Sequence, residues 1–221
     1  MSEKTHKGSF DYPVLLNLAG KPCVVIGGGQ VAWRKVRGLL ECGAKVKLIS
    51  PEVTPGLEKL AKSGKIAYLR RAYRKGDLKG AFLTIGATDE PAVNERIFAE
   101  ATQADILVNI VDRPALCSFT LPARVRRGPV MVAVSTGGAS PALSRRLREM
   151  LEETIGPEYG RLAQLLGKLR AEVKRSFPTE AGRRRAWQRI LDCPEVLALL
   201  RAGKVSEAEA KARRCLSSPS A

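Results

Sequence analysis

A glycine-rich turn near the N-terminus constrains the fold of this chain more than any other stretch. An apolar, β-branched run at 24–26 leads into Gly27, Gly28 and Gly29, and a helical pattern follows. Gly27, Gly29 and Ala32 have the spacing G-x-G-x-x-A, which is typical of turns that bind the pyrophosphate of a dinucleotide. The glycines permit a tight turn and a close approach of the phosphates, and the amino end of the helix presents unpaired N–H groups to them. The turn therefore predicts a nucleotide-binding site.

Strands and helices alternate through the first half of the chain. We expect strands at 22–26, 44–49, 65–69, 81–87 and 106–111, helices at 30–42 and 90–104, and a loop followed by a helix within 51–63. This order indicates an α/β fold with a parallel, doubly wound sheet of the Rossmann type. Ligands bind beyond the carboxyl ends of the strands in such sheets. The residues expected along that edge are Gly27, Ser50, Thr88 and Asp112.

The end of the second predicted strand bears on the choice of cofactor. An acidic residue there often binds the ribose hydroxyls of NAD, whereas this chain has Ser50-Pro51-Glu52. Either Glu52, or Ser50 together with the backbone, would make that contact. No arginine lies in this stretch to bind the 2′-phosphate of NADP. The sequence therefore favours NAD, and the choice between Glu52 and Ser50 stays open.

The pattern changes after residue 113. Two further strands are expected at 118–123 and 130–134, joined by a basic connection at 124–128. A loop rich in glycine and hydroxyl side chains follows at 135–141, and a helix begins near Pro141, a residue suited to the first helical turn. This loop is either a linker with a helix N-cap or a ligand-binding loop. From about Gly156 onward the pattern is helical.

The composition excludes several classes of site. The five cysteines include no C-x-x-C pair, and the only histidine is His6. Imidazole-ligated metal sites and Ser–His or Cys–His catalysis are therefore not expected, and acid–base chemistry must use carboxylates, hydroxyls or lysines. No apolar run approaches the ~18 residues that a membrane span needs. The polar stretch 1–10 lacks the apolar centre of a secretory signal, so we expect a cytoplasmic protein without a membrane partner.

The formal net charge of +16 implies an anionic partner. Nucleic acid is one class of partner, and a polycarboxylate or phosphate ligand is the other. The sequence contains no recognisable helix-turn-helix, zinc finger or RNA-binding motif, and its aromatic content of 5% leaves few rings to stack on bases. We therefore expect a small-molecule partner and no nucleic acid.

Four motifs, in this order, resemble the precorrin-2 dehydrogenase family, which includes the dehydrogenase/ferrochelatase part of sirohaem synthase. They are Gly27–Ala32 with Arg34-Lys35, Ala87-Thr88-Asp89, Val108–Asp112 and Ser135–Pro141. Phe119-x-x-Pro122 and Arg145–Arg148 also look like the family. The likeness extends from about residue 12 to 148, and more loosely over the helical tail.

The resemblance implies a homodimer whose subunit has three parts: an NAD-binding Rossmann domain at 1–113, a central dimerisation segment at 114–150, and a helical C-terminal domain at 151–221. It also implies the reaction of precorrin-2 with NAD⁺ to give sirohydrochlorin and NADH, for the synthesis of sirohaem. Some members also insert Fe²⁺ into sirohydrochlorin. This second activity stays open here, because a carboxylate without histidine suffices to deprotonate the macrocycle.

The site residues follow from the motifs and the resemblance together. Asp112 is the expected catalytic acid/base, with a structural cap of the following turn as its alternative role. Asp89 is either a helix N-cap or a contact near the nicotinamide. The expected NAD-binding residues are Gly27, Gly28, Gly29, Gln30, Val31, Ser50, Pro51, Glu52, Thr88 and Asp89. The expected tetrapyrrole-binding residues are Asn109, Ser135, Thr136, Gly137, Gly138 and Ser140, and no metal ligand is expected.

A function of another class also fits part of the sequence. The chain would then be an NAD- or ligand-sensing Rossmann module whose basic helical tail binds nucleic acid. Arg183, Arg184 and Arg185 and the high net charge support this alternative. Salt-sensitive DNA binding at physiological ionic strength would distinguish it from the dehydrogenase.

Overall fold

The computed structural model describes residues 11–217, and the chain divides into two compact units between Leu121 and Pro122. The first unit contains two hydrophobic cores and the second unit contains one. The N-terminal stretch 1–10, with His6, lies outside the described residues. The three-part division at 113 and 150 stays a prediction.

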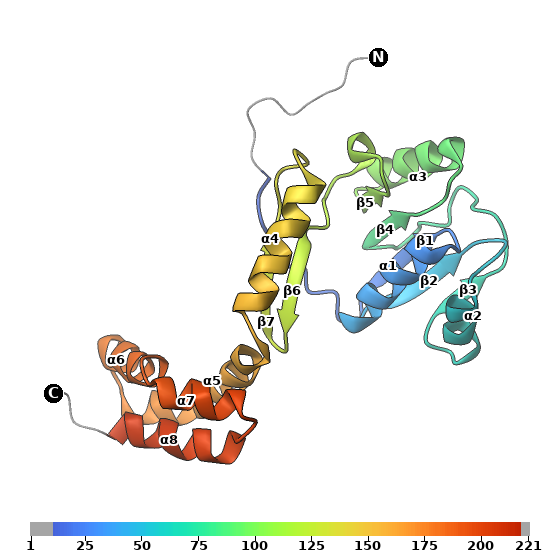
Figure 1. The fold of residues 1–221 in the computed structure, drawn as a ribbon. Coiled ribbons are helices and arrows are strands. Elements are labelled where there is room, and N and C mark those ends of the chain that lie inside the picture. Colours follow the sequence, from blue (N-terminus) through green and yellow to red (C-terminus); the bar gives the residue numbers. More distant parts are fainter. Residues whose placement is uncertain (1–10, 218–221) are drawn as a thin grey trace. The chain divides into compact units, whose positions relative to one another are not determined.

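The first unit is built on a five-stranded parallel sheet with the order β3-β2-β1-β4-β5 (Figure 1). The strands are β1 (Pro22–Ile26), β2 (Lys45–Ile49), β3 (Ala67–Leu69), β4 (Leu83–Gly86) and β5 (Leu107–Ile110). Ile26 at the end of β1 is paired with Ile49 on one side and Gly86 on the other. The chain leaves β1 toward β2 and returns on the other side at β4, which creates a switch point at the carboxyl end of β1.

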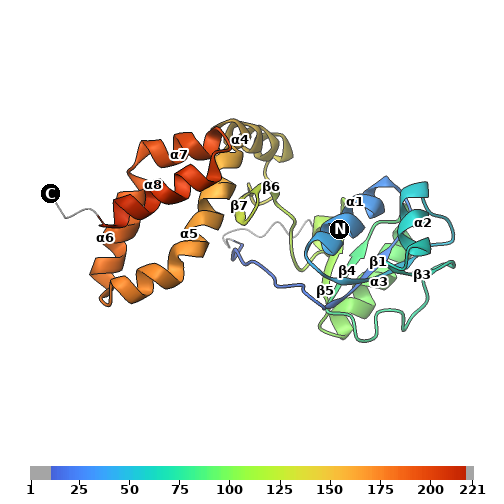
Figure 2. The ribbon, with the colours of Figure 1, turned by 90° about the horizontal axis from the view of Figure 1, so that it is seen from below.

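Helices cover both faces of this sheet (Figure 2). They are α1 (Gln30–Glu41), α2 (Pro55–Lys62) and α3 (Pro91–Gln103), and a short 3₁₀ helix, η1 (Pro114–Leu116), follows β5. Alternate residues of β1 enter different cores. Val25 shares a core with Val36 of α1, and Val24 shares the other core with Ile97 of α3. Burial on both faces explains why the strands are nearly continuous apolar runs, and it confirms the predicted doubly wound fold.

Two carboxylates order the long connection between β3 and β4. Asp77 accepts hydrogen bonds from Arg71 Nη1 (2.8 Å) and Nη2 (2.6 Å), and from the backbone N–H of Arg74 (2.8 Å). These bonds, the Arg71 pair foremost, hold the pKa of Asp77 below its usual range. Glu100 of α3 accepts from the hydroxyl of Tyr73 (2.5 Å) and from two backbone N–H groups of the same connection. The irregular segment is therefore fixed to the sheet and to α3.

The second unit begins with a hairpin of β6 (Ala123–Arg127) and β7 (Val130–Val134), followed by α4 (Pro141–Thr154). The predicted strand at 118–123 is wrong, and the basic residues 124–127, predicted as a connection, form β6 instead. The backbone N–H of Ser118 donates to the carbonyl of Val108 in β5 (2.8 Å), so the stretch around Ser118 belongs to the first unit. Within β6 only Val125 is buried and the flanking arginines are exposed or half-buried, an alternation that the run of positive charge concealed.

Four helices complete the second unit: α5 (Pro157–Ser176), α6 (Glu180–Leu191), α7 (Pro194–Arg201) and α8 (Val205–Ser217). Their core includes Leu165, Leu169, Ile190 and Leu200. Glu158 at the start of α5 is buried and accepts from Arg201 Nε (3.1 Å) and Nη2 (2.8 Å), which lowers its pKa and ties α5 to the end of α7. The predicted helical C-terminal part is confirmed.

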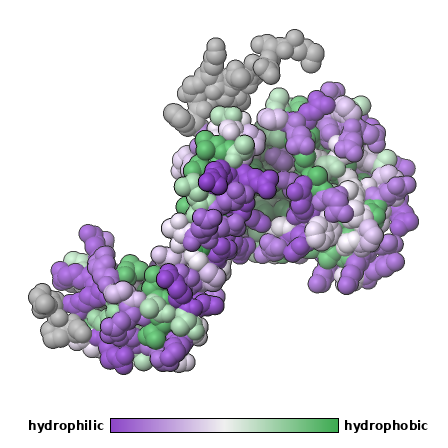
Figure 3. All heavy atoms as spheres, in the orientation of Figure 1, coloured by the Kyte–Doolittle hydropathy of each residue, from purple (hydrophilic) through white to green (hydrophobic). Residues whose placement is uncertain are grey.

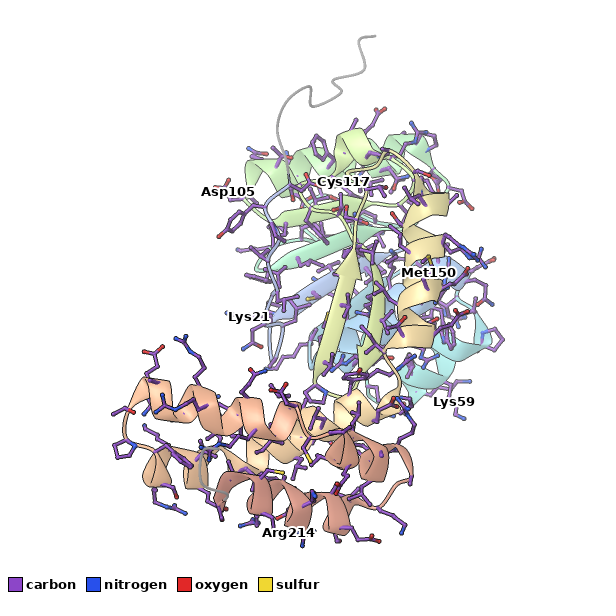
Figure 4. The ribbon with its side chains drawn as sticks, turned by 60° about the vertical axis from the view of Figure 1, so that its left-hand side comes forward. Lys21, Lys59, Asp105, Cys117, Met150 and Arg214 are labelled. Atoms are coloured by element: carbon purple, nitrogen blue, oxygen red, sulfur yellow. The ribbon has the colours of Figure 1, made fainter. Side chains whose placement is uncertain are left out.

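The surface is mostly hydrophilic on the face shown in Figure 3. No residue of helix α4 is buried, and among its charged side chains it exposes the apolar residues Leu143, Leu147 and Met150, of which Met150 is labelled in Figure 4. None of the helices within 11–217 combines the length and the apolar character needed to cross a bilayer.

Candidate functional site

Gly27, the first glycine of the turn, is required by its backbone conformation and by its close approach to the chain that follows β4. Gly27 has φ +116°, a backbone conformation that L side chains rarely adopt. A Cβ atom on Gly27 would lie 2.1 Å from the carbonyl oxygen of Ala87, which follows β4. The Gly27 N–H donates to Ile49 of β2 (2.9 Å). The turn therefore leaves β1 through a gap between the ends of its two neighbouring strands.

Gly28 and Gly29 meet different surroundings. A Cβ on Gly28 would lie 1.8 Å from the carbonyl oxygen of Glu52, and the Gly28 carbonyl accepts from the N–H of Thr54 (2.9 Å). Gly28 thus packs against the loop between β2 and α2. A Cβ on Gly29 would meet nothing within 4 Å. The open side of the turn is at Gly29, where the sequence placed the pyrophosphate.

Helix α1 begins at this turn with an unfilled amino end. Gly29 is its N-cap, no side chain caps it, and its first turn contains no acidic residue. Ala32 is fully buried, so the helix packs closely on the sheet as the third position of the motif predicts. The exposed Gln30 and half-buried Val31 belong to the first turn. Free N–H groups beside an open glycine fit the pyrophosphate of a dinucleotide.

The end of β2 is arranged differently for its hydroxyl and its carboxylate. Ser50 is buried, and its hydroxyl donates to the carbonyl of Glu52 (2.6 Å). Its own carbonyl accepts from the hydroxyl of Tyr68 (3.0 Å). Ser50 therefore shapes the loop that packs on Gly28, whereas Pro51 and the side chain of Glu52 are exposed.

A cavity of about 200 Å³ lies at the carboxyl ends of β4 and β5, next to the start of α1. The predicted residues that line it are Val31, Thr88, Asp89 and Asp112, and the others are Ala87, Pro91, Asn94, Val111 and Arg113. The N-cap of α3 is Glu90, so the N-cap role considered for Asp89 is wrong. The structure thus brings four predicted residues, from the first turn of α1 and from the loops after β4 and β5, to one cavity.

Asn94 is a lining residue that the sequence reasoning missed. It is buried, its amide donates to the carbonyl of Thr88 (2.9 Å), and its Oδ1 has no partner among residues 11–217. The available signal was a polar side chain three residues before Ile97, on the buried face of α3. Asn94 holds the loop after β4 in place and so shapes the cavity wall.

Asp112 combines three features that a structural cap does not need. Its backbone is left-handed, with φ +57°. Its side chain is exposed at the cavity, and it makes no hydrogen bond or ion pair within the described part of the chain. The turn after β5 is closed by the backbone of Arg113, whose N–H donates to Ile110 (3.2 Å). The carboxylate of Asp112 is therefore available to a ligand.

Asn109 and Cys117 hold the segment after β5. The amide of Asn109 donates to the carbonyl of Phe119 (3.0 Å), so this N–H group is used within the first unit. Cys117 Sγ accepts from the N–H of Ile110 (3.3 Å). Burial raises the pKa of the Cys117 thiol, with that N–H opposing the shift.

The remaining predicted residues form the loop between β7 and α4 in the second unit. Thr136 Oγ1 accepts from the N–H of Ser140 (3.1 Å), and Ser140 caps α4 by accepting from the N–H of Leu143 (3.1 Å). Gly137 and Gly138 both have positive φ. The loop is therefore ordered by its own hydrogen bonds, and Ser140 has the N-cap role that the sequence considered.

A doubly wound parallel sheet with this glycine turn at its switch point defines a dinucleotide-binding protein of the Rossmann type. Three family models match the chain in succession: a putative NAD(P)-binding family at 14–123, the sirohaem biosynthesis protein central family at 127–154, and the sirohaem synthase dimerisation region at 158–216. The family model described as a dimerisation region thus matches helices α5–α8. A dimerisation role for 114–150 stays a prediction.

Individual proteins agree with these matches. The chain is 47% identical to a sirohaem synthase of Nitrosospira multiformis over 82% of its length, and 41% identical to one of Nitrosococcus oceani over 89%. It spans only about two fifths of these relatives, 39% and 42%. The structure of SirC, a precorrin-2 dehydrogenase, superposes with a TM-score of 0.75 at 28% identity, over 91% of this chain and 100% of SirC. The chain belongs to the family that comprises precorrin-2 dehydrogenases and the corresponding part of sirohaem synthases.

Proposed function

We propose that this protein oxidises precorrin-2 to sirohydrochlorin with NAD⁺, in the biosynthesis of sirohaem. The likeness to SirC, over 91% of this chain and the whole of SirC, supports this reaction. The observation that carries the proposal is the unpaired carboxylate of Asp112, which the left-handed backbone holds at the cavity beside the glycine turn.

NAD fits the residues of the first unit. The pyrophosphate would bind at the glycine turn and the first turn of α1, that is, at Gly27, Gly28, Gly29, Gln30 and Val31. The turn is open at Gly29, and no side chain caps the N–H groups of the helix. The segment Ser50–Glu52 would contact the adenosine ribose, with the exposed carboxylate of Glu52 as the hydrogen-bond acceptor. Thr88 and Asp89 line the cavity at the nicotinamide end. When bound, NAD⁺ supplies the acceptor of the hydride.

Asp112 takes the proton that balances the hydride. Dehydrogenation removes one hydride and one proton from the substrate, and the carboxylate of Asp112 accepts the proton from a ring N–H. An unpaired carboxylate serves this role because no cation in the described chain competes for its oxygens. The same group would deprotonate the macrocycle during Fe²⁺ insertion. The experiment below tests this second activity with Fe²⁺ as a substrate.

The tetrapyrrole is a polycarboxylate, and the net charge of +16 favours its approach. We assign its binding to Asn109 and to the ordered loop of Ser135, Thr136, Gly137, Gly138 and Ser140. The two glycines with positive φ leave backbone N–H groups without flanking side-chain bulk. This assignment needs no nucleic acid and no membrane.

We propose a homodimer in the cytoplasm as the working form. The match of α5–α8 to a dimerisation region and the exposed apolar residues of α4 support the dimer. The five free cysteines support a reducing compartment. The comparisons do not favour the sensing module with a nucleic-acid-binding tail.

The test is an anaerobic absorbance assay with enzymatically generated precorrin-2 and NAD⁺. Asp112→Asn should bind NAD as wild type does and lose a factor of about 10² to 10⁴ in kcat, because proton transfer by a positioned side chain contributes that much. Asp105→Asn is the matched control. Asp105 precedes β5, is exposed, has φ +52° and is also unpaired within the described chain, but it does not line the cavity (Figure 4).

Three outcomes separate the alternatives. Sirohydrochlorin that appears only with NAD⁺, and a loss of turnover confined to Asp112→Asn, support the proposal. Wild-type turnover in Asp112→Asn would remove Asp112 as the base. NAD binding without any spectral change in the wild-type protein would contradict the dehydrogenase. Fe²⁺ added afterwards tests chelation, by comparison with the rate without protein.

A further inference from the structure

Asn94 is a polar residue on the buried face of helix α3. The buried residues of this helix are Asn94, Ile97 and Ala101, which share one face at helical spacing. The side chain of Asn94 is only 6% exposed. Packing against the sheet would favour an apolar side chain at this position, as it does at the other two. Asn94 therefore needs an explanation other than the core.

The two ends of the Asn94 amide meet different surroundings. Its Nδ2 donates to the carbonyl of Thr88 (2.9 Å), whereas its Oδ1 is buried without a partner in the described part of the chain. A Cβ atom built on Gly86 would lie 3.1 Å from Oδ1 and 2.5 Å from Ile110 Cδ1, so Oδ1 lies beside the end of β4 next to apolar atoms. Exchanging the two ends would turn Oδ1 toward another carbonyl oxygen, and the two oxygens would repel. The orientation of the amide is therefore fixed.

The unpartnered oxygen is a cost to the stability of the fold. A buried acceptor without a donor loses its hydration and gains nothing in return. Leucine has a similar volume and no polar atom, so it would remove this cost, but it would also remove the donor to Thr88. What the protein gains from Asn94 is therefore a fixed position for the Thr88 carbonyl.

The loop that Asn94 holds forms one wall of the cavity at the carboxyl ends of β4 and β5. Thr88 and Asp89 line the cavity together with Asn94. The N–H of Ala87 donates to Ile26 at the end of β1 (2.7 Å). The loop is thus anchored to the sheet at Ala87 and to α3 at Thr88, and Asp89 follows this second anchor directly.

We infer that Asn94 is a positioning residue for the nicotinamide half of NAD. This inference rests on the proposed NAD-dependent function, in which Thr88 and Asp89 lie at the nicotinamide. By holding the Thr88 carbonyl, Asn94 keeps these two residues in the cavity wall before the cofactor arrives. A loop that is already ordered loses less conformational freedom on binding, so the affinity is higher. The glycine turn is anchored separately, through the bond from the N–H of Gly27 to Ile49 (2.9 Å).

The experiment compares NAD⁺ with ADP-ribose, which carries the pyrophosphate but no nicotinamide. Isothermal titration calorimetry measures both affinities on the full-length protein. Asn94→Leu should weaken NAD⁺ binding about tenfold, which corresponds to the loss of about one hydrogen bond. Its affinity for ADP-ribose should stay within about twofold of wild type, because the glycine turn keeps its own anchor.

Ile97→Val is the matched control for a loss of packing. Ile97 is fully buried on the same face of α3, and it does not line the cavity. The variant should destabilise the first unit, because it removes a buried methyl group. Both affinities of the folded control should nevertheless stay within about twofold of wild type. The control thus separates a weakened core from a misplaced loop.

Asn94→Asp tests the donor itself, because aspartate has nearly the shape of asparagine. When protonated, its carboxyl can donate to the Thr88 carbonyl, and when ionised it repels that carbonyl. Burial raises the pKa of such a carboxyl. The NAD⁺ affinity of the variant, divided by that of wild type at the same pH, should be close to one at about pH 5 and should fall as the pH rises toward about 8. The wild-type reference removes the titration of Asp89 and Asp112, which line the same cavity with Arg113.

The outcomes separate this inference from the proposed function. Wild-type NAD⁺ affinity in Asn94→Leu would overturn the inference alone, and so would an equal loss of NAD⁺ and ADP-ribose binding or a loss matched by Ile97→Val. A wild-type protein that does not bind NAD⁺ would contradict the proposed function and the inference with it. If Asn94→Leu does not fold, Asn94→Asp decides, since an affinity ratio that does not change with pH would overturn the inference.

Discussion

The sharpest test of the nucleotide-binding turn compares alanine at two adjacent glycines. In Gly28→Ala the new Cβ lies 1.8 Å from the carbonyl oxygen of Glu52, although real Cβ contacts under 3.0 Å essentially never occur. The loop must therefore move by more than 1 Å. In Gly29→Ala the new Cβ meets nothing within 4 Å, and the N-cap backbone (φ −78°, ψ −173°) suits any residue.

The cost of Gly28→Ala follows from the bonds that anchor this loop. Thr54 N–H donates to Gly28 (2.9 Å), and the hydroxyl of Ser50 donates to Glu52 (2.6 Å). Overpacking costs about 1–3 kcal/mol, and one weakened hydrogen bond adds about 1 kcal/mol. We expect the free energy of unfolding of the first unit to fall by about 2–4 kcal/mol. Gly29→Ala should change it by less than about 0.5 kcal/mol.

The two tryptophans allow each unit to be followed by itself. Trp33 lies in α1 of the first unit and Trp187 in α6 of the second. In a Trp187→Phe background, Trp33 fluorescence during urea unfolding reports the first unit. NAD affinity is then measured on both folded alanine variants. A third variant, Gly29→Asp, adds bulk and negative charge on the open side of the turn and should abolish NAD binding. Equal unfolding midpoints for Gly28→Ala and Gly29→Ala would refute the packing argument, and NAD binding by Gly29→Asp would refute the placement of the pyrophosphate.

Two further substitutions test the connection between β3 and β4 and the core of the second unit. Asp77→Asn should lower stability at pH 7 by about 1–3 kcal/mol. The pKa of Asp77 is lowered in the folded state, so its contribution to stability is present above the unfolded pKa near 4 and is lost as the pH falls through the lower folded pKa. The free energy of unfolding of the variant should therefore fall less steeply in acid. Urea titrations in acid that give the same pH dependence for both proteins would contradict this. Leu169→Ala, at a fully buried position, should destabilise the second unit by about 2–5 kcal/mol, whereas Leu191→Ala, 52% exposed, should stay within about 0.5 kcal/mol when Trp187 fluorescence follows unfolding.

The sequence predicted most of the sheet because burial on both faces leaves a simple record. Strand β1 was predicted with its observed bounds, and the apolar run at 81–87 contains β4. Strand β7 was also predicted with its observed bounds, but the first strand of the hairpin was misplaced, because β6 buries a single side chain, Val125, between arginines and ends at a turn with positive φ at Gly128. Neither feature produces an apolar run.

The site was predictable as an edge of the sheet, but not in the duties of its side chains. Glycine spacing located the turn, yet only the packing distinguishes Gly28, which faces the loop at Glu52, from the open Gly29. Likewise Ser50 donates within its own loop. Asn94 escaped notice because its partner is a backbone carbonyl, which has no signature in the sequence.

The left-handed backbone of Asp112 limits how this position can change over evolution. Aspartate, asparagine and glycine tolerate such a conformation, whereas β-branched residues are strained there. The residues that the turn accepts easily are therefore mostly ones that cannot act as a carboxylate, and glutamate would have to pay the conformational cost. A lineage that lost the aspartate would keep its fold through asparagine or glycine, and would leave an intact dinucleotide-binding scaffold free for another use.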